Sequence, residues 1–169
     1  MSNPNQPQLD PSLSRQLQAF VSAKLSACKA SPTPFPWIEV DKLLPSAVMN
    51  AINDYFPSPD LMTAMPEGRT GNSYAHRYRR LYPLNSHSVS LMPNEASSFW
   101  KQFDQLVQSL IPQLMAALPE PPITQKHTVF PLSEMKARID LWADCGGYQI
   151  EPHTDAPHKL ATFLLYCST

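Results

Sequence analysis

The chain has 169 residues and a mass of 19.0 kDa, a length that fits one compact domain with a terminal extension and is too short for two full hydrophobic cores. Hydrophobic residues make up 43% and charged residues 16% of the sequence, so the chain can bury a core. With 13 basic and 14 acidic residues the net charge is −1, which argues against nucleic acid as a partner, because a surface that binds polyanions needs an excess of positive charge.

The apolar runs, the N-terminal residues and the cysteines argue against a membrane-spanning, a secreted and a disulfide-stabilised protein. No apolar run approaches the ~20 residues that span a bilayer, and the polar start MSNPNQPQLDPS lacks the pattern of a secretory signal. Three widely spaced cysteines without a CxxC pair indicate neither a disulfide framework nor a zinc knuckle: Cys28, Cys145 and Cys167. We therefore expect a soluble, cytoplasmic protein with reduced thiols and no membrane partner.

The first part of the chain is predicted to be mainly helical. Residues 1–10 are rich in Asn, Pro and Gln and are predicted to form a disordered tail. Within residues 11–122, apolar side chains recur at helical spacing in three segments, 12–28, 45–56 and 94–118. Pro112 is expected to kink or shorten the third helix. A Pro-rich connector leads into a short predicted strand, Trp37–Val40.

Residues 57–85 are predicted to form a loop with a local excess of positive charge. Arginine and histidine side chains alternate there with tyrosines: Arg69, Tyr74, His76, Arg77, Tyr78, Arg79, Arg80 and Tyr82. Such a cluster can contact an anionic or aromatic substrate. The alternative is a solvated loop whose arginine heads reach into water.

After residue 122 the apolar pattern changes from the period of a helix to that of a strand. Apolar residues alternate with polar ones over 135–143, a turn follows at 144–147, and further extended stretches are predicted at 148–155 and 160–166. Residues 123–169 therefore read as the start of a β region that forms one domain with residues 31–122. The predicted fold class is α+β.

The strongest chemical pattern is His153-Thr154-Asp155. On an extended strand, side chains two residues apart project to the same face, so an imidazole nitrogen and a carboxylate oxygen can reach one metal ion. One His and one Asp are two members of the 2-His-1-carboxylate triad, which leaves positions on iron(II) open for a co-substrate and O₂. On these three residues alone, an exposed polar turn is the alternative.

The residues around this pattern resemble the Fe(II)/2-oxoglutarate dioxygenase superfamily, in a prolyl-hydroxylase-like branch. A Gly-Gly-Tyr turn leads into PHTDAPHK, and an apolar stretch follows. Upstream, PFPWIEVDKLLPSAVMNAINDYFPS resembles the opening of the same branch, in which a strand and the phrase D-x-x-L-P introduce a helix that ends in Phe-Pro. The two matches together span roughly residues 34–169.

The resemblance implies a double-stranded β-helix, or jelly roll, with the N-terminal helices packed on it. It implies that His153 and Asp155 bind Fe(II), and that Tyr148 donates a hydrogen bond to 2-oxoglutarate. Arg138, on the preceding predicted strand, is a further candidate for contact with 2-oxoglutarate. The implied reaction is hydroxylation of a C–H bond in an amino acid, a protein side chain or a small metabolite, with ascorbate as a reductant.

The sequence also departs from the family pattern. The family has a second metal-binding His and a basic residue for 2-oxoglutarate on late strands, and neither follows the HxD pattern here. We therefore expect an N-terminal portion of an oxygenase with an incomplete jelly roll, inactive by itself, which self-associates through unpaired strands.

Two alternatives stay open. The first is a zinc site formed by His153, Asp155 and His158. An offset of five residues places His158 on the opposite face of a strand from His153, unless Pro157 kinks the chain. The second alternative is a non-catalytic jelly-roll interaction module that retains the HxD pattern.

Overall fold

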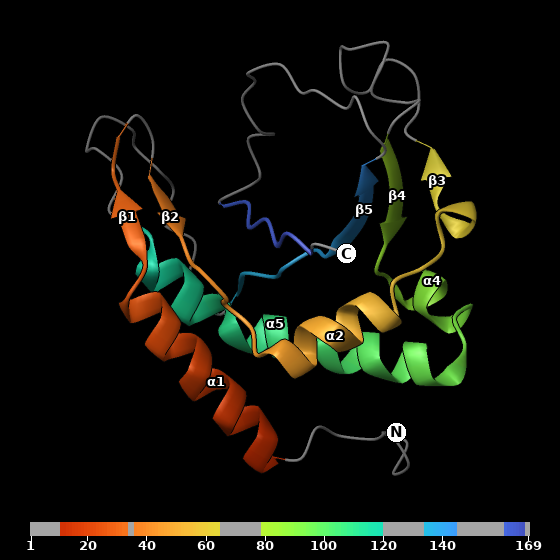
Figure 1. Ribbon diagram of the computed structural model, residues 1–169, viewed down its shortest axis with the longest axis horizontal. Coiled ribbons are helices and arrows are strands. Elements are labelled where there is room, and N and C mark those ends of the chain that lie inside the picture. Colours follow the sequence, from red (N-terminus) through yellow and green to blue (C-terminus); the bar gives the residue numbers. More distant parts are fainter. Residues whose placement is uncertain (1–10, 34–35, 65–78, 120–133, 145–160, 168–169) are drawn as a thin grey trace. The chain divides into compact units, whose positions relative to one another are not determined.

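A computed structural model describes residues 11–33, 36–64, 79–119, 134–144 and 161–167 of the chain (Figure 1). Helices and small antiparallel sheets make up the described part, which confirms the predicted α+β class. The chain divides into two compact units, each built from two separate stretches of sequence. The first unit comprises the described residues of Met1–Ala51 and Ser98–Ala137, and the second those of Ile52–Ser97 and Arg138–Thr169.

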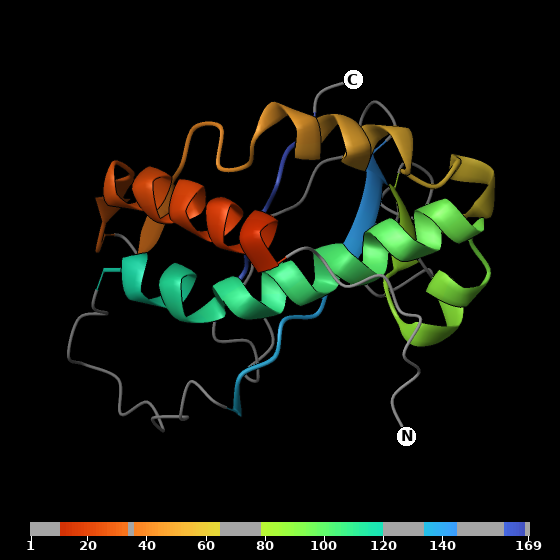
Figure 2. The ribbon, with the colours of Figure 1, turned by 90° about the horizontal axis from the view of Figure 1, so that it is seen from below.

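Two long helices form the centre of the first unit. Helix α1 (Pro11–Ser26) lies beside α5 (Asn94–Ala117), as Figure 2 shows. Two side-chain hydrogen bonds join them, from Gln18 Nε2 to Ser109 Oγ at 3.1 Å and from Ser22 Oγ to Gln113 Oε1 at 3.1 Å. Both partners advance by four residues, or about one turn, from the first bond to the second, so the helices run in the same direction.

The apolar faces of these helices carry most of the buried side chains of the first unit, to which Leu44 adds one from the segment before α2. The spacing of three or four residues that predicted the helices also defines the buried set: Leu17, Val21 and Leu25 on α1, and Trp100, Phe103, Leu106, Leu110 and Leu114 on α5. The ring centroids of Trp100 and Phe103 lie 5.6 Å apart in an edge-to-face arrangement. Each fully buried aliphatic or aromatic side chain contributes about 1.5–3 kcal/mol, so this face accounts for the formation of both helices.

A small hairpin connects α1 to the next helix. Strand β1 (Lys29–Ser31) pairs antiparallel with β2 (Trp37–Glu39). The sequence analysis predicted a strand at β2 but none at β1, which lies between the first predicted helix and the Pro-rich connector. After β2, Lys42 adopts a left-handed conformation with φ of 51°, and α2 (Ser46–Asp54) begins directly after Pro45. The predicted order of strand, D-x-x-L-P and helix is therefore confirmed.

The second unit contains a three-stranded antiparallel sheet. Its strands are β3 (Thr63–Ala64), β4 (Arg79–Pro83) and β5 (Asp140–Asp144), in the order β3-β4-β5 (Figure 1). The described residues of this unit also form two short helices, η1 (Pro59–Leu61) and α4 (Ser86–Ser90). Tyr82 pairs with Leu141 across β4 and β5, and both side chains are buried, so this face of the sheet belongs to the core.

The prediction for residues 57–85 is wrong, and one of the two effects expected of Pro112, a shorter third helix, is not seen. Residues 57–85 were predicted as a loop, yet they include η1, β3 and β4; the basic side chains of β4 masked a strand that is stabilised by pairing with β5. Pro112 does not shorten α5, which continues to Ala117. A proline removes one backbone hydrogen bond, but Leu110 and Leu114 on either side of it are buried and stabilise the helix through this position.

Two predicted strands differ from the structure. The strand expected from residue 135 begins only at Asp140. The strand expected at 160–166 is not formed in residues 161–167, which have no regular secondary structure. The expected tail at 1–10 and the extended stretch at 148–155 lie outside the described residues. Within the described ranges, no helix combines the length and apolarity that crossing a bilayer requires.

Candidate functional site

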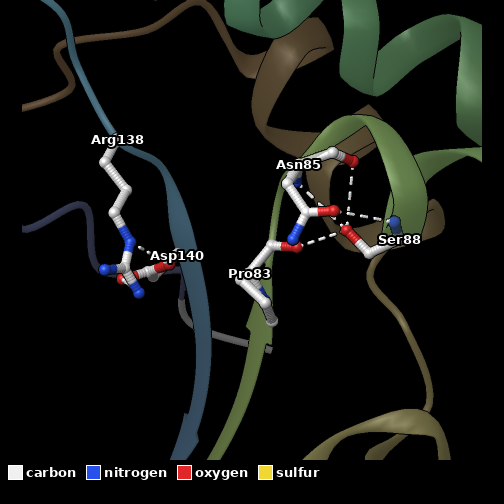
Figure 3. A network of polar contacts seen from close by, with 5 residues as sticks. All are labelled: Pro83, Asn85, Ser88, Arg138 and Asp140. Atoms are coloured by element: carbon white, nitrogen blue, oxygen red, sulfur yellow. Dashed lines mark hydrogen bonds and ion pairs between the residues drawn. The ribbon is translucent and has the colours of Figure 1, made fainter.

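Arg138, the predicted contact for 2-oxoglutarate, lies two residues before β5 and pairs with Asp140. Its Nε donates to Asp140 Oδ1 at 3.1 Å, and its second terminal nitrogen lies 3.0 Å from Oδ2 (Figure 3). The spacing of two residues on extended backbone brings the side chains to one face, so the guanidinium fork meets both carboxylate oxygens. The Arg138 side chain is 67% exposed and that of Asp140 is 20% exposed. Arg138 is therefore a solvent-facing cation held by a largely covered carboxylate.

A second charge pair lies at the other end of β5. Arg79 faces Asp144 across the sheet, with 3.0 Å between Arg79 Nε and Asp144 Oδ1. The Arg79 guanidinium also lies 4.1 Å from the centroid of the Trp142 ring, a cation–π contact of about 0.5–2 kcal/mol. The Arg79 side chain is only 19% exposed. These contacts fix the end of β5 to β4.

A compact polar network follows the other strand, β4. The side chain of Asn85 accepts hydrogen bonds from the backbone N–H groups of His87 and Ser88, both at 3.0 Å, and so caps α4. Figure 3 shows the bond from Ser88. The Ser88 hydroxyl donates to the carbonyl oxygen of Pro83. Tyr82 donates from its phenol to the Ser88 carbonyl oxygen at 2.8 Å, and burial raises the pKa of this phenol. The network satisfies the polar groups at the start of α4.

In the first unit, Gln108 of α5 holds the extended segment that precedes Arg138. Its side-chain nitrogen donates to the Ala137 carbonyl oxygen at 2.8 Å, and its side-chain oxygen accepts from the Ala137 N–H at 3.0 Å. The same nitrogen donates to Asp104 Oδ1 at 2.9 Å. Because the amide pairs with both backbone groups of one residue, it replaces a strand partner at Ala137. The predicted strand begins late because its partner β4 ends at Pro83, opposite Asp140, and the chain then enters α4.

The remaining predicted site residues lie outside the described part of the chain: Tyr148, His153, Asp155 and His158. Among the described residues, no group of three or more His, Cys, Asp or Glu side chains is arranged to hold a metal ion. The donor set that the sequence provides, one imidazole nitrogen and one carboxylate oxygen, matches the ligand preference of iron(II). Of the residues predicted to form the site, the structure describes Arg138.

The chain matches no family model, no curated protein and no solved structure in the comparisons with known proteins.

Sequence reasoning missed three residues that organise this region. The sequence analysis treated Asp140 only as one of the polar residues that alternate with apolar ones over 135–143. Side chains two residues apart on an extended chain share one face, so the spacing of Arg138 and Asp140 could have indicated their ion pair. The pairing of Arg79 with Asp144 depends on the register of strands far apart in the sequence, so no local pattern indicates it. Gln108 carries no sequence signal, because its partner is a backbone group 29 residues away.

Proposed function

We propose that this chain carries two protein ligands, His153 and Asp155, of an Fe(II) site in a 2-oxoglutarate-dependent oxygenase with a double-stranded β-helix core. The observation that carries the proposal is the HxD pattern within GGYQIEPHTDAPHK, residues 146–159. The substrate class that fits this chemistry is a C–H bond of an amino acid, a protein side chain or a small metabolite.

Two features of the described residues support this proposal. Strand β2, the D-x-x-L-P phrase and α2 follow one another in the order that the resemblance implies. Strand β5 ends at Asp144 in an antiparallel sheet, and the Gly146–Gly147 turn and the HxD pattern come next in the sequence. An antiparallel strand that leads into a Gly-Gly turn favours a second strand after the turn.

The side chains have separate roles in this proposal. Iron(II) together with 2-oxoglutarate and O₂ would supply the oxidising chemistry when bound. His153 would hold the metal through a neutral imidazole nitrogen and Asp155 through its carboxylate. The Tyr148 hydroxyl would donate a hydrogen bond to a carboxylate of the co-substrate.

Arg138 has a secondary role in the same proposal. A guanidinium carries five N–H donors, so those that are not directed at Asp140 can bind a second carboxylate. The Asp140 carboxylate compensates part of the arginine charge, which weakens the attraction for an anionic co-substrate. We therefore expect Arg138→Gln to reduce 2-oxoglutarate affinity less than loss of the metal does.

The test is a titration of the 169-residue chain with Co²⁺, a spectroscopic substitute for Fe(II). Removing a partner of a metal ligand typically costs 10–100-fold in affinity, so we expect His153→Ala and Asp155→Ala each to weaken Co²⁺ binding by at least about 100-fold. His87→Ala is the control, because His87 is an exposed residue of α4 and its loss should leave the titration unchanged.

The same titration separates the alternatives. If His158→Ala weakens binding as strongly as His153→Ala does, the three-ligand zinc site is supported and the oxygenase proposal is contradicted. If neither His153→Ala nor Asp155→Ala changes the titration, the HxD pattern binds no metal.

A further inference from the structure

Ser58, in the second unit, is an exposed serine that is followed by a proline. It lies between Pro57 and Pro59 in the sequence, and its backbone has a polyproline-like conformation, with φ of −55° and ψ of 141°. The ring of a following proline restricts the preceding residue to extended conformations of this kind. An exposed hydroxyl on extended backbone, with proline directly after it, is the acceptor that proline-directed protein kinases use.

The side chain of Ser58 does not cap η1, although Ser58 directly precedes this short helix. The helix is closed by backbone hydrogen bonds instead. The carbonyl oxygen of Ser58 accepts from the N–H of Leu61 at 2.9 Å, and that of Pro59 accepts from the N–H of Met62 at 3.1 Å. A group added to the Oγ atom of Ser58 therefore displaces no capping bond.

Two further pairs of a hydroxyl residue and a proline occur in the sequence, Ser31-Pro32 and Thr33-Pro34. The Ser31 hydroxyl donates to the Thr33 carbonyl oxygen at 3.0 Å and accepts from the Thr33 N–H at 3.2 Å. The two hydroxyl oxygens lie 3.4 Å apart. A phosphate on either residue would disturb this turn after β1, whereas a phosphate on Ser58 disturbs no such turn.

A cation lies close to Ser58. Arg80, the second residue of β4, donates from a terminal nitrogen to the carbonyl oxygen of Pro59 at 3.2 Å. Consecutive Cα atoms are about 3.8 Å apart, so the guanidinium is bound one residue away from Ser58. Because the Pro59 oxygen also accepts from Met62, the guanidinium can turn to a phosphate without leaving this carbonyl unpaired.

The surrounding charges favour this contact. Arg80 is anchored in the middle strand of its sheet, opposite Ala64 of β3 and Ala143 of β5. A phosphoserine carries about 1.5–2 negative charges at neutral pH, and a guanidinium binds phosphate through paired, charge-assisted hydrogen bonds. Asp60 in the first turn of η1 opposes the phosphate, but Asp60 is exposed, so water and salt weaken its repulsion.

We propose that Ser58 is a phosphorylation site and that Arg80 binds the phosphate. In the transfer, a bond forms between Ser58 Oγ and the γ-phosphorus of ATP, the bond from this phosphorus to ADP breaks, and the hydroxyl proton passes to a base of the kinase. The product ties the start of η1 to β4 by charge-assisted hydrogen bonds. This modification uses no residue of the proposed metal site.

The first experiment tests Ser58 as the acceptor. The folded 169-residue chain is incubated with a mitogen-activated protein kinase and MgATP, and mass spectrometry locates the phosphate. We expect Ser58 to carry most of it and Ser58→Ala to lose it. Thr33→Ala is the matched control, because Thr33 is also exposed and followed by proline, and its loss should leave the incorporation unchanged. Phosphate at Thr33 with none at Ser58 contradicts the proposed site.

The second experiment tests Arg80 as the partner. The second pKa of phosphoserine is about 6, and a nearby cation lowers this pKa because it favours the dianion. The phosphorus NMR signal of a chain with phosphoserine placed at position 58 by synthesis reports the pKa directly. We expect it to be lower in the otherwise wild-type chain than in Arg80→Gln by at least about half a unit, and we expect this difference to vanish in urea.

A conservative variant separates phosphate binding from a change in the fold. Arg80→Lys keeps the charge but lacks the paired fork, so it should retain part of the decrease in the phosphate pKa. An equal phosphate pKa in the wild-type, Arg80→Lys and Arg80→Gln chains shows that residue 80 does not bind the phosphate. A decrease that persists in urea assigns the effect to neighbours in the sequence and also overturns the role of Arg80.

Discussion

Tyr82 is the residue whose environment makes the sharpest prediction about pH. Its ring is buried, its phenol donates to the Ser88 carbonyl oxygen, and burial raises its pKa above the ordinary value of about 10. Above pH ~10 the unfolded chain has released this proton while the folded chain still holds it, so the free energy of unfolding falls as pH rises. The stabilisation is complete below the pKa of the unfolded state and is lost through the alkaline range.

Urea unfolding at a series of pH values tests this prediction. Tyr82→Phe should cost about 0.5–1.5 kcal/mol at neutral pH through the lost hydrogen bond and should reduce the fall in stability above pH ~10. Tyr166→Phe is the control, since Tyr166 is 83% exposed. The prediction fails if both variants keep the alkaline loss of the wild type.

At the scale of elements, Gln108 makes the connection between α5 and the segment before β5. Replacing it by Leu leaves the half-buried N–H and C=O of Ala137 without this partner, and the net loss of each such hydrogen bond costs about 0.5–1.5 kcal/mol. Gln102→Leu is the matched control, because Gln102 is also a half-buried residue of α5 and makes a single bond, to Ser98 one turn away. We expect Gln108→Leu to lower the free energy of unfolding by more than 1 kcal/mol beyond the effect of Gln102→Leu, and equal effects would contradict this role.

Helices were more predictable from the sequence than strands, for a physical reason. The buried faces of α1 and α5 follow from residues three and four apart, which the sequence displays directly. Strand β4 depends on its pairing with β5, some 60 residues away. Its basic residues by themselves favour a loop, because the sequence does not show that one of them pairs with Asp144 across the sheet. The late start of β5 follows from the end of its partner β4 at Pro83, which no period in the sequence can show.

The residue types of the candidate site come from the sequence, and the contacts around Arg138 come from the structure. The HxD pattern and the two glycines before it can be read from the sequence alone. Arg138 was also selected there, but the carboxylate that holds it is visible only in the structure. How a neighbouring charge changes the affinity of an arginine for an anion cannot be judged before the pair is seen.

At the scale of the whole molecule, self-association should depend on salt in a characteristic way. Contacts between uncharged apolar surfaces are strengthened by sulfate, which is excluded from protein surfaces, whereas ion pairs are screened by any salt. We expect the self-associated fraction to rise in ammonium sulfate and to change little in sodium chloride of equal ionic strength. Scattering measurements at fixed protein concentration check this, and dissociation in both salts would indicate a charged interface instead.

The central claim is that His153 and Asp155 bind one metal ion. The most direct test is to follow the imidazole nitrogen resonances of the five histidines while Zn²⁺, a diamagnetic substitute for Fe(II), is added to the 169-residue chain and to Asp155→Ala. The proposal predicts that the His153 signal shifts first, that His87 and His158 do not follow it, and that the shift is lost in Asp155→Ala. A His153 signal that does not change with Zn²⁺, or that changes equally in Asp155→Ala, would contradict the claim.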